Sequence, residues 1–467
     1  MDNSAKAAAV VIGGGISGLA CAYRLRQLGV ETTLLEVDSR VGGLIGTVER
    51  DGFLFESGPQ SFQGTPALLG LIRELEIEGE LLKADSRAPR YILRHGRLHK
   101  VPMSPQAVLT SSLLGAGSRW KIVSEPLRTT QPPGEEESIA SFVRRKFGHE
   151  ILEYLVAPFV SGVYAGDPEK LSLRTAFPTL EEWEREYGSI IRGAMKYRAA
   201  QVSAPGLAKE KGPPLCSFRK GLGALAQALA DRLGGTVRTG VRAEGLRRAD
   251  SPGSSGYEIR TVQGGRSEAL VARAVVLATP AYIASHLAGT LSPPLAHTLS
   301  GIAYAPVAVV AAGYYAHQFV QPPQGFGFLV PRSEKYHTLG TVWNSSLFPG
   351  RAPHENVAIT SFVGGATDPE IIAKKEEEIA AIVEAENARI MGITGPPLAS
   401  AVWKHTKALP QYNLGHAHIV RAIRDAESGI PGLFFSGNYL EGPSLGKCVE
   451  QGFQTAEAAR AYLLAAK

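Results

Sequence analysis

A glycine-rich turn directly after the first apolar run constrains the fold more than any other feature of this chain. Residues 10–12 are Val-Val-Ile, and they lead into Gly13-Gly14-Gly15-Ile16-Ser17-Gly18. This is the pattern G-x-G-x-x-G between an expected strand and an expected helix, the setting in which it binds dinucleotides. Gly13 allows the tight turn, Gly15 admits a pyrophosphate, and Gly18 lets the helix pack closely on the strand. The amides at the start of the helix then face the phosphates.

A second apolar run, residues 32–35, ends at Glu36. In dinucleotide-binding βαβ units a carboxylate at this place hydrogen-bonds an adenosine ribose. Arg40-Val41-Gly42-Gly43 follows, either as a cationic loop that reaches the same pyrophosphate or as a solvated turn. The turn, the helix, the second strand and Glu36 together predict a dinucleotide site.

Composition excludes several other classes of protein. The 467 residues are enough for two or three domains, and 44% hydrophobic with 20% charged residues is typical of a globular protein. A net charge of +5 without a basic cluster interleaved with aromatics argues against nucleic acid as a partner. Cys21, Cys216 and Cys448 form neither a disulfide framework nor a C-x-x-C motif, which indicates a reducing compartment. We expect no metal site, because the pair His416 and His418 reads equally well as the start of a helix.

We expect a cytoplasmic protein, soluble or peripheral on a membrane, that is not secreted. Lys6 and the apolar stretch after it imitate a secretory signal, but cleavage would destroy the glycine turn. The longest apolar run, residues 302–316, is too short to span a bilayer and contains Pro306.

The nucleotide domain is expected to be assembled from three separate parts of the chain. Residues 274–277 and 432–435 read as buried strands, and a helix is expected over residues 449–464. Residues 237–248 and 257–262 read as a hairpin. Two different insertions lie between these parts. Residues 138–198 have helical periodicity, whereas residues 307–312, 327–330, 338–343 and 358–363 read as strands, followed by a helix over residues 376–391.

Two segments indicate which dinucleotide is bound. Arg40-Val41-Gly42-Gly43 comes directly after Glu36, and a second turn contains Gly58-Pro59-Gln60-Ser61. In these segments the chain resembles the monoamine oxidase superfamily, whose members follow the ribose glutamate with Arg-x-Gly-Gly and bind FAD. The resemblance implies an α/β fold: a Rossmann-like FAD-binding domain of the p-hydroxybenzoate hydroxylase/monoamine oxidase type, an inserted β-rich substrate domain and an inserted α-helical, membrane-associating domain.

A longer stretch narrows the resemblance to one family. Residues 159–168, followed by Leu171-Ser172, resemble the signature of the protoporphyrinogen oxidases. Other matching segments are spread over nearly the whole chain: residues 89–92, 217–222, 409–412, 415–416, 437–439 and 442–450. The resemblance implies an FAD-binding domain of residues 1–85, 212–290 and 400–467, a substrate domain of residues 86–100 and 291–399, and a helical domain of residues 101–211.

By this resemblance the substrate is a porphyrinogen, oxidised by six electrons in two-electron steps during haem or chlorophyll biosynthesis. Hydride leaves a meso methylene for flavin N5, imine–enamine rearrangement follows, and O2 re-oxidises the flavin to give H2O2. The sequence has no evident Ser/His/Asp or Cys/His arrangement for nucleophilic catalysis. We therefore expect no catalytic side chain, because the cofactor performs the redox step while the protein binds and orients.

The resemblance assigns four residues to the substrate. Arg90 is the candidate cation: it matches a family arginine that pairs with a substrate propionate, a task that suits a guanidinium, and the alternative is a solvated surface arginine. Phe326, Leu329 and Leu339 fall in the strand-rich insertion that supplies apolar clamps in the family. Such an apolar stripe is more often ordinary core, which is the alternative for each of the three.

The resemblance also adds cofactor residues to those of the two glycine loops and the Gly58–Ser61 turn. The backbone of Val241 is expected at the adenine, and Trp403 on the side of the flavin domain that faces the substrate. Pro443, Ser444 and Leu445 are expected at the isoalloxazine, ahead of a final helix whose dipole favours negative charge on reduced flavin. The family more often has a small apolar residue where Pro443 or Ser444 stands.

The expected partners are a porphyrinogen, O2 and a membrane surface, with a homodimer and product transfer to a ferrochelatase as further options. The nearest alternative is oxidation of coproporphyrinogen III by a relative with a roomier, more cationic pocket. An amine oxidase or a carotenoid desaturase would use the same scaffold. A different class, the escort proteins of prenylated GTPases, shares the fold without flavin catalysis, and the complete glycine loops disfavour it.

Overall fold

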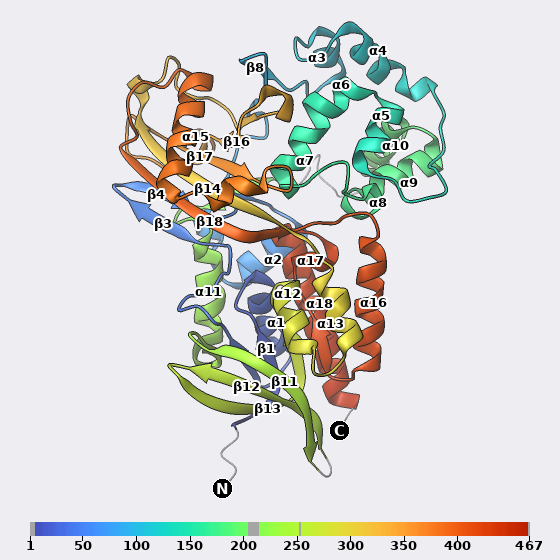
Figure 1. Ribbon diagram of the computed structural model, residues 1–467, viewed down its shortest axis with the longest axis vertical. Helices are drawn as coiled ribbons and strands as arrows, with labels where there is room; N and C mark the ends of the chain where they lie inside the picture. The colour runs from blue at the N-terminus through green and yellow to red at the C-terminus, as the bar shows by residue number, and fades with distance from the viewer. Residues whose placement is uncertain (1–4, 204–213, 252–253, 466–467) are drawn as a thin grey trace.

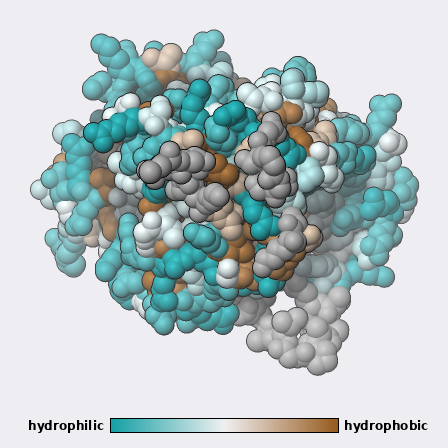
Figure 2. Space-filling view, turned by 90° about the horizontal axis from the view of Figure 1, so that it is seen from below, coloured by the Kyte–Doolittle hydropathy of each residue, from teal (hydrophilic) through white to brown (hydrophobic). Residues whose placement is uncertain are grey.

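The computed structural model describes residues 5–203, 214–251 and 254–465. Figure 1 shows three regions: a sheet with covering helices at the bottom, a second sheet at the upper left, and a group of helices at the upper right. Both termini lie at the bottom, beside the first sheet. Seen from below, this end has a largely hydrophilic surface with scattered hydrophobic residues (Figure 2).

The first sheet has a parallel centre made from distant parts of the chain. Its strands follow the order β10-β2-β1-β13-β12-β11, and β19 also pairs with β13. The bounds are β1 (Ala5–Ile12), β2 (Thr32–Leu35), β10 (Val237–Arg238), β11 (Arg242–Ser251), β12 (Ser254–Gln263), β13 (Arg266–Leu277) and β19 (Leu433–Phe435). β10, β2, β1, β13 and β19 run parallel, whereas β11, β12 and β13 form an antiparallel meander. The assembly from three parts and the hairpin are confirmed, although the expected strand over residues 237–248 is interrupted after Arg238.

Helices cover both faces of this sheet, as a parallel sheet requires. One core cluster joins the sheet to α1 (Ile16–Gln27), α2 (Pro66–Glu74), α11 (Gly223–Leu233) and α18 (Leu445–Ala465). The other joins it to α12 (Ala281–Ala288), α13 (Pro293–Ser300), α16 (His416–Gly429) and α17 (Asn438–Glu441). α1 and α18 approach so closely that a Cβ on Gly452 would lie 2.7 Å from the Ser17 carbonyl oxygen. α18 starts four residues before the expected Val449.

The second sheet is mainly antiparallel, in the order β18-β14-β17-β16-β15-β7-β8. The bounds are β7 (Arg90–Arg94), β8 (Arg97–Lys100), β14 (Tyr304–Tyr315), β15 (Gly327–Leu329), β16 (Thr338–Val342), β17 (Asn356–Gly364) and β18 (Ala399–Pro410). All four expected strands of the insertion are present, and α15 (Glu376–Met391) has the expected bounds. The expected boundary at residue 400 is wrong for one strand, because β18 pairs with β14 and therefore belongs to this sheet.

The third region, which we call the helical lobe, comprises residues 101–203. Its helices are α3 (Pro105–Thr110), α4 (Ala116–Ser124), α5 (Ile139–Lys146), α6 (His149–Ile151), α7 (Ala157–Tyr164), α8 (Leu173–Ala176), α9 (Pro178–Tyr187) and α10 (Ile190–Ser203). A π-helical turn, η3 (Leu152–Val156), joins α6 to α7, and η2 (Glu125–Leu127) follows α4. The helical periodicity of residues 138–198 is thus confirmed. Within the described ranges no helix combines the length and the apolar character needed to cross a bilayer.

Short elements connect the three regions. β3 (Thr47–Arg50) and β4 (Phe53–Glu56) form a hairpin, and β9 (Leu215–Phe218) lies between β5 (Phe62–Gln63) and β6 (Leu81–Lys83). The remaining helical turns are α14 (Asn344–Leu347), η1 (Glu78–Glu80), η4 (Gly234–Thr236), η5 (Ala316–Gln318), η6 (Arg332–Glu334) and η7 (Pro369–Ala373).

Candidate cofactor and substrate site

The carboxyl ends of the parallel strands gather the predicted nucleotide residues at one edge of the first sheet. Gly13 follows β1 and donates its N–H to the Leu35 carbonyl of β2 at 2.8 Å. The Ser436 N–H, directly after β19, binds the Leu277 carbonyl of β13 at 3.0 Å. In open α/β sheets this edge is where ligands bind.

The glycine turn leaves room where a phosphate is expected. Gly13 has a φ of +112°, and a Cβ there would lie 2.6 Å from the Ala278 carbonyl oxygen. A Cβ on Gly15, by contrast, would meet no atom within 4 Å. Gly15 is the N-cap of α1 and offers no side-chain hydrogen bond to the first amides of the helix. These amides are therefore available to an anion.

Glu36 is buried at this edge and is already fixed by the backbone. One carboxylate oxygen accepts the Gly14 N–H at 2.6 Å, and the other accepts the Asp38 N–H at 2.8 Å. A carboxylate oxygen accepts more than one hydrogen bond, so both oxygens still have lone pairs for ribose hydroxyls. Val241 lies beside it, since its N–H binds the Glu36 carbonyl at 2.8 Å.

Arg40 holds the second glycine loop rather than extending freely. Its guanidinium donates to the carbonyls of Ile45 at 2.8 Å and Gly43 at 2.9 Å. The Gly42 N–H binds the Gly14 carbonyl at 2.8 Å, which places this loop directly on the glycine turn. Arg40 thus shapes the loop and adds a positive charge beside the expected pyrophosphate.

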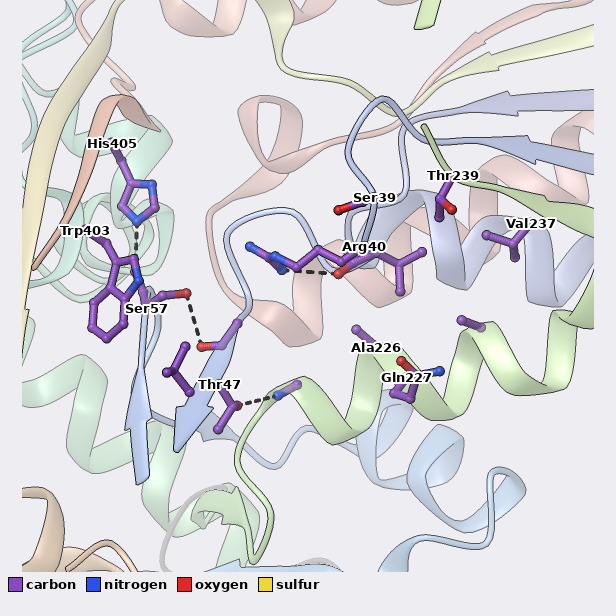
Figure 3. A pocket seen from close by; sticks show the side chains of 15 residues that line it. Ser39, Arg40, Thr47, Ser57, Ala226, Gln227, Val237, Thr239, Trp403 and His405 are labelled. Carbon is purple, nitrogen blue, oxygen red and sulfur yellow. Dashed lines mark hydrogen bonds between the residues drawn. The ribbon is translucent and has the colours of Figure 1, made fainter. Parts of the chain in front are cut away.

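A pocket of about 560 Å³ opens between this loop, α11, β3 and β18 (Figure 3). Of the predicted cofactor residues, Arg40 and Trp403 line it, whereas the glycines of the first turn do not. His405 donates its Nε2–H to the Ser57 carbonyl at 2.8 Å, and the Ser57 hydroxyl donates to the Gly46 carbonyl at 3.1 Å. The pocket wall is therefore tied to the turn that follows β4.

That turn, Gly58-Pro59-Gln60-Ser61, is held from both sides. A Cβ on Gly58 would lie 2.1 Å from the Leu44 carbonyl oxygen, so the turn packs tightly on the loop of Arg40. The buried Gln60 amide donates to the Gly58 carbonyl at 2.8 Å, and its oxygen accepts from Asn344 Nδ2 at 2.7 Å. The Gln60 side chain consequently fixes the turn and links it to α14 of the second-sheet region.

A buried ion pair lies immediately before this turn. The Glu56 carboxylate and the Arg351 guanidinium are both almost fully buried, 3.6 Å apart. Leu222 N–H and the Thr47 hydroxyl donate to Glu56 at 2.8 and 2.7 Å. Burial nevertheless raises the pKa of the Glu56 carboxyl, an effect that Thr47, Arg351 and Leu222 only partly offset.

Three buried polar atoms near the strand ends have no partner among the described residues: Thr279 Oγ1, Ser436 Oγ and Gln451 Nε2. Gln451 already accepts the Gly437 N–H at 2.7 Å through its oxygen, so its amide N–H remains available. Buried polar atoms are normally paired, and orphans at one edge suit a polar ligand. Together with the open space at Gly15, they fit the phosphates and hydroxyls of a dinucleotide such as FAD.

Pro443, Ser444 and Leu445 stand at the start of α18. Leu445 is buried and begins the helix, and the Ser444 hydroxyl accepts the Lys447 N–H at 3.3 Å. Ser444 therefore caps the helix, which explains a polar residue at a place where the family more often has a small apolar one.

One face of the second sheet carries two of the four candidate substrate residues, Arg90 and Leu329. Register places Arg90 opposite Gly327, and Leu329 opposite Gly340. The next strands continue this row of paired residues. Gly340 of β16 lies opposite Phe362 of β17. Val309 of β14 then pairs with Phe362 on one side and with Trp403 of β18 on the other. Paired residues point to the same face of a sheet. Arg90, Leu329, Phe362 and Trp403 therefore share a face.

Arg90 is exposed, and its guanidinium lies 5.2 Å from the ring centroid of Phe326. No carboxylate in the described part of the chain forms an ion pair with it, so its charge is available to a carboxylate ligand. The Phe326 ring supports the guanidinium through a cation–π contact. Phe326 thus contacts the Arg90 guanidinium and also packs against the apolar cluster that contains Leu347 and Phe348.

The three predicted apolar positions do not form a single cluster. Leu329 packs against the helical lobe, whereas Leu339, at a register shift of β16, packs with Ala165 and Val307. Sequence reasoning missed Phe362, which is only partly buried in the middle of β17 and lies against the cluster of Leu339. The lone aromatic in the expected strand of residues 358–363 was the available signal, but the strand pattern does not reveal which face it occupies.

Comparison with known proteins identifies the class. The family model described as "Flavin containing amine oxidoreductase" matches residues 16–460 of this chain. The chain therefore belongs to the flavin-containing amine oxidoreductase family and is an FAD-dependent oxidoreductase.

Individual relatives identify the branch of the family. The chloroplastic protoporphyrinogen oxidase of Nicotiana tabacum is 35% identical over 97% of this chain and 85% of its own length. Coproporphyrinogen III oxidase of Bacillus subtilis is 29% identical over 97% of this chain and 98% of its own length. A provisionally assigned protoporphyrinogen oxidase from Exiguobacterium sp. 255-15, 24% identical, has the same fold, with a TM-score of 0.82 over 99% of both chains. The chain belongs to the protoporphyrinogen oxidase branch.

Proposed function

We propose that this chain oxidises protoporphyrinogen IX to protoporphyrin IX with O2 as acceptor. The observation that carries the proposal is the 35% identity with a protoporphyrinogen oxidase over 97% of the chain. Bound FAD would supply the two-electron oxidation chemistry. It would be held by the glycine turn, Glu36, the loop of Arg40 and the start of α18.

In this proposal the protein binds and orients the substrate. The exposed guanidinium of Arg90 pairs with a propionate, since a planar guanidinium matches a carboxylate with two parallel hydrogen bonds. Leu329 and Phe362, on the same sheet face, supply apolar surface for the macrocycle. Packing of the macrocycle on that face excludes water and aligns one methylene with the cofactor.

The first experiment asks whether the purified protein is a flavoprotein that uses this substrate. We expect a yellow protein with flavin absorbance, and porphyrin fluorescence on addition of protoporphyrinogen IX in air. A colourless protein that stays colourless with added FAD would support an escort-type binding role and contradict the proposal. Faster turnover of coproporphyrinogen III would assign the chain to the activity named for the Bacillus subtilis relative.

Arg90→Ala tests the proposed propionate contact. We expect kcat/KM to fall about tenfold or more, because one charge-assisted hydrogen-bonded pair is lost. The FAD content should be unchanged. Arg97→Ala is the matched control, because Arg97 is also exposed on the same β7–β8 hairpin. An unchanged kcat/KM in Arg90→Ala would remove this residue from the site.

We further propose that the helical lobe rests on an anionic membrane surface, which would place the enzyme peripherally on the cytoplasmic side. Trp120 on α4 is 69% exposed, and Leu127, two turns further on, is 85% exposed. Exposed cations flank them at Lys121 and Arg128. An apolar stripe with flanking basic residues is the pattern of an interfacial helix.

Sedimentation with vesicles tests this docking. We expect the protein to bind phosphatidylglycerol vesicles more than phosphatidylcholine vesicles, and the double variant Trp120→Ser/Leu127→Ser to lose most of this binding. Val320→Ser is the control, since Val320 is 81% exposed but lies outside the lobe. Equal loss in both variants, or no loss in either, would contradict the assignment of the docking surface.

A further inference from the structure

The segment Gln411-Tyr412-Asn413-Leu414-Gly415-His416 joins the helical lobe to the flavin-binding part of the molecule. It follows β18 and leads into α16. Three of its side chains, Gln411, Tyr412 and His416, are buried although all three are polar. Buried polar side chains carry a cost unless they are hydrogen-bonded, so their partners reveal what the segment does.

On the flavin side, two of these side chains hold the first turn of α17, which begins at Asn438. The Tyr412 hydroxyl donates to the Asn438 carbonyl, and His416 donates its Nε2–H to the Tyr439 carbonyl at 2.8 Å. Burial lowers the pKa of His416, which favours the neutral ring. Asn438 and Tyr439 directly follow Gly437, whose N–H is bound by Gln451 of α18. The turn therefore lies between the strand end of β19 and the helix whose start faces the expected flavin.

On the other side, the same segment is bound by the helical lobe. The Gln411 amide donates to the Tyr164 carbonyl at 2.9 Å, and the Ser172 N–H donates to the Tyr412 carbonyl at 2.9 Å. The Tyr412 and Tyr164 rings meet edge to face, with centroids 5.8 Å apart. These contacts come from the last residue of α7 and from the N-cap of α8.

The contacts between the helical lobe and residues 411–416 leave the two little freedom to move relative to each other. Ala165, next to Tyr164, has a φ of +48°, a left-handed conformation that non-glycine residues rarely adopt. Its carbonyl accepts the Ala366 N–H of the second-sheet region at 2.7 Å. Further along the segment, the Gly415 N–H binds Glu136 of the lobe at 2.8 Å. A displacement of the lobe would consequently pull on Tyr412 and Gly415 together.

We propose that Tyr412 and His416 are positioning residues that set the Asn438–Tyr439 turn according to the placement of the helical lobe. Gln411 and Tyr164 form the lobe end of this connection. A change in the placement of the lobe would then alter the flavin environment through these hydrogen bonds and the backbone of residues 411–416 that joins them. The inference needs only flavin binding, which the family establishes, and is independent of the identity of the porphyrinogen.

Tyr412→Phe tests the flavin end, because it keeps the ring and removes only the hydroxyl. We expect the dissociation constant for FAD, measured by reconstituting the apoprotein, to rise about two- to tenfold, the size of one hydrogen bond. The visible circular dichroism of bound FAD should change as well. Tyr282→Phe is the control, since it also removes a tyrosine hydroxyl, from a partly buried ring on α12 outside the segment.

Gln411→Leu tests the lobe end, because it removes the contact with Tyr164 and leaves Tyr412 and His416 in place. We expect a smaller rise in the same dissociation constant, and a combined effect with Tyr412→Phe that is less than the product of the two. His416→Gln, which keeps an N–H donor, should preserve FAD affinity better than His416→Leu. If these variants lower only the thermal midpoint and bind FAD with native affinity and dichroism, the segment is merely structural and the inference is wrong.

Discussion

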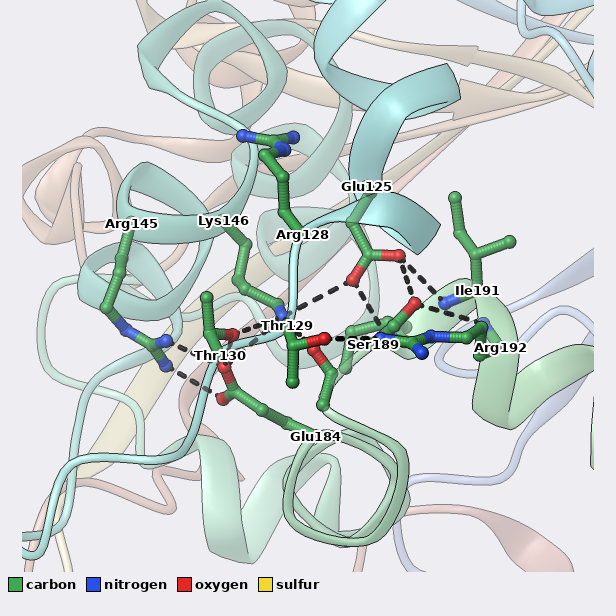
Figure 4. A network of polar contacts seen from close by, with 12 residues as sticks. Glu125, Arg128, Thr129, Thr130, Arg145, Lys146, Glu184, Ser189, Ile191 and Arg192 are labelled. Atoms are coloured by element: carbon green, nitrogen blue, oxygen red, sulfur yellow. Dashed lines mark hydrogen bonds and ion pairs between the residues drawn. The ribbon is translucent and has the colours of Figure 1, made fainter.

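The nucleotide sheet and the helical lobe differ in what they bury at their centres. At the centre of the sheet, Val10, Val11, Val275 and Val276 are fully buried apolar side chains on parallel strands. The lobe adds a buried ion network to its apolar core: Lys146 Nζ lies 3.3 Å from both Glu125 and Glu184 and donates to the Thr130 hydroxyl at 2.6 Å (Figure 4).

The difference follows from what each region must hold in place. Apolar burial is non-directional, and the tight turns of the sheet are specified locally by glycines. The lobe consists of short helices, and its ion network fixes their mutual positions through directional contacts. Glu125, for example, binds the Ser189 hydroxyl at 2.6 Å and the Ile190 N–H at 2.9 Å at the start of α10. The lobe should therefore depend on single partners and on pH, while the sheet depends on packing.

The largest effect is expected for Gly18→Ala, which we compare with Gly15→Ala in the same glycine turn. A Cβ on Gly18 would lie 1.9 Å from the Gly13 carbonyl oxygen, so Gly18→Ala must displace backbone. Because backbone atoms must move, we expect a loss well beyond the ~1–3 kcal/mol typical of overpacking, and little bound FAD. Thermal unfolding and the flavin-to-protein absorbance ratio measure both effects.

Gly15→Ala is the matched variant, because a Cβ there would meet no atom of the protein. We expect native thermal stability of the apoprotein but about tenfold weaker FAD binding, since the methyl group would occupy the proposed pyrophosphate cradle. Equal behaviour of the two variants would contradict the distinction between packing and cofactor glycines.

Next in size is Lys146→Met in the lobe. It leaves Glu125 and Glu184 buried without their shared cation, and breaking such a pair typically costs ~3–5 kcal/mol. Denaturant unfolding should show the loss, with proteolytic cleavage of the lobe before the nucleotide sheet. Lys170→Met is the control, because Lys170 is exposed and its ion pair with Asp167 should contribute under ~1 kcal/mol. Similar losses in both variants would show that burial of the network is not what matters.

The smallest expected effect is a difference in pH response. Burial raises the pKa of the Glu184 carboxyl, but hydrogen bonds from Arg145 and Thr130 with the charge of Lys146 outweigh it and lower the pKa to about 2. Because the folded pKa is below the ordinary 4.5, this contribution is present above pH 4.5 and is lost as the pH falls toward 2. Glu56, at the junction with the sheet, has a raised pKa, so its contribution is full below pH 4.5 and declines as the pH rises.

Limited proteolysis at pH 3.5 and pH 7 tests this contrast. We expect acid to expose the lobe first, and Glu184→Gln to reduce the difference between the two pH values at the cost of stability at neutral pH. Glu56→Gln should leave the acid response of the lobe unchanged. Acid cleavage that begins in the nucleotide sheet would refute the assignment.

Much of the nucleotide site could be predicted from the sequence. Gly13, Gly15, Gly18 and Glu36 belong to one short βαβ unit, whose spacing fixes their relation before any tertiary contact forms. The strands over residues 274–277 and 432–435 were recognisable as apolar runs, and they do pair in the first sheet. Local pattern and burial are sufficient here because the contacts are short in sequence or apolar and non-directional.

Other features needed contacts between distant residues. Trp403 lies on a strand that pairs with β14, which placed it in the second sheet rather than the first. The register of β15, β16 and β17 decided that Phe362 shares a face with Leu329, while Phe326 packs elsewhere. Arg40 lies on the loop beside the glycine turn, where its guanidinium binds carbonyls of its own loop. The alternation of residues along a strand shows which side chains share a face, but it does not show which neighbouring element each face contacts.

A dinucleotide turn on a strand–helix unit can be predicted from the amino-acid sequence alone, because glycine spacing and apolar periodicity act over a few residues. Which distant side chains meet is visible only in the folded molecule. The buried ion network of the lobe and the binding of Tyr412 to the Asn438 carbonyl are examples. The physical reason is that hydrogen bonds and buried charges are directional and short-ranged, so their partners are set by how the three regions pack together.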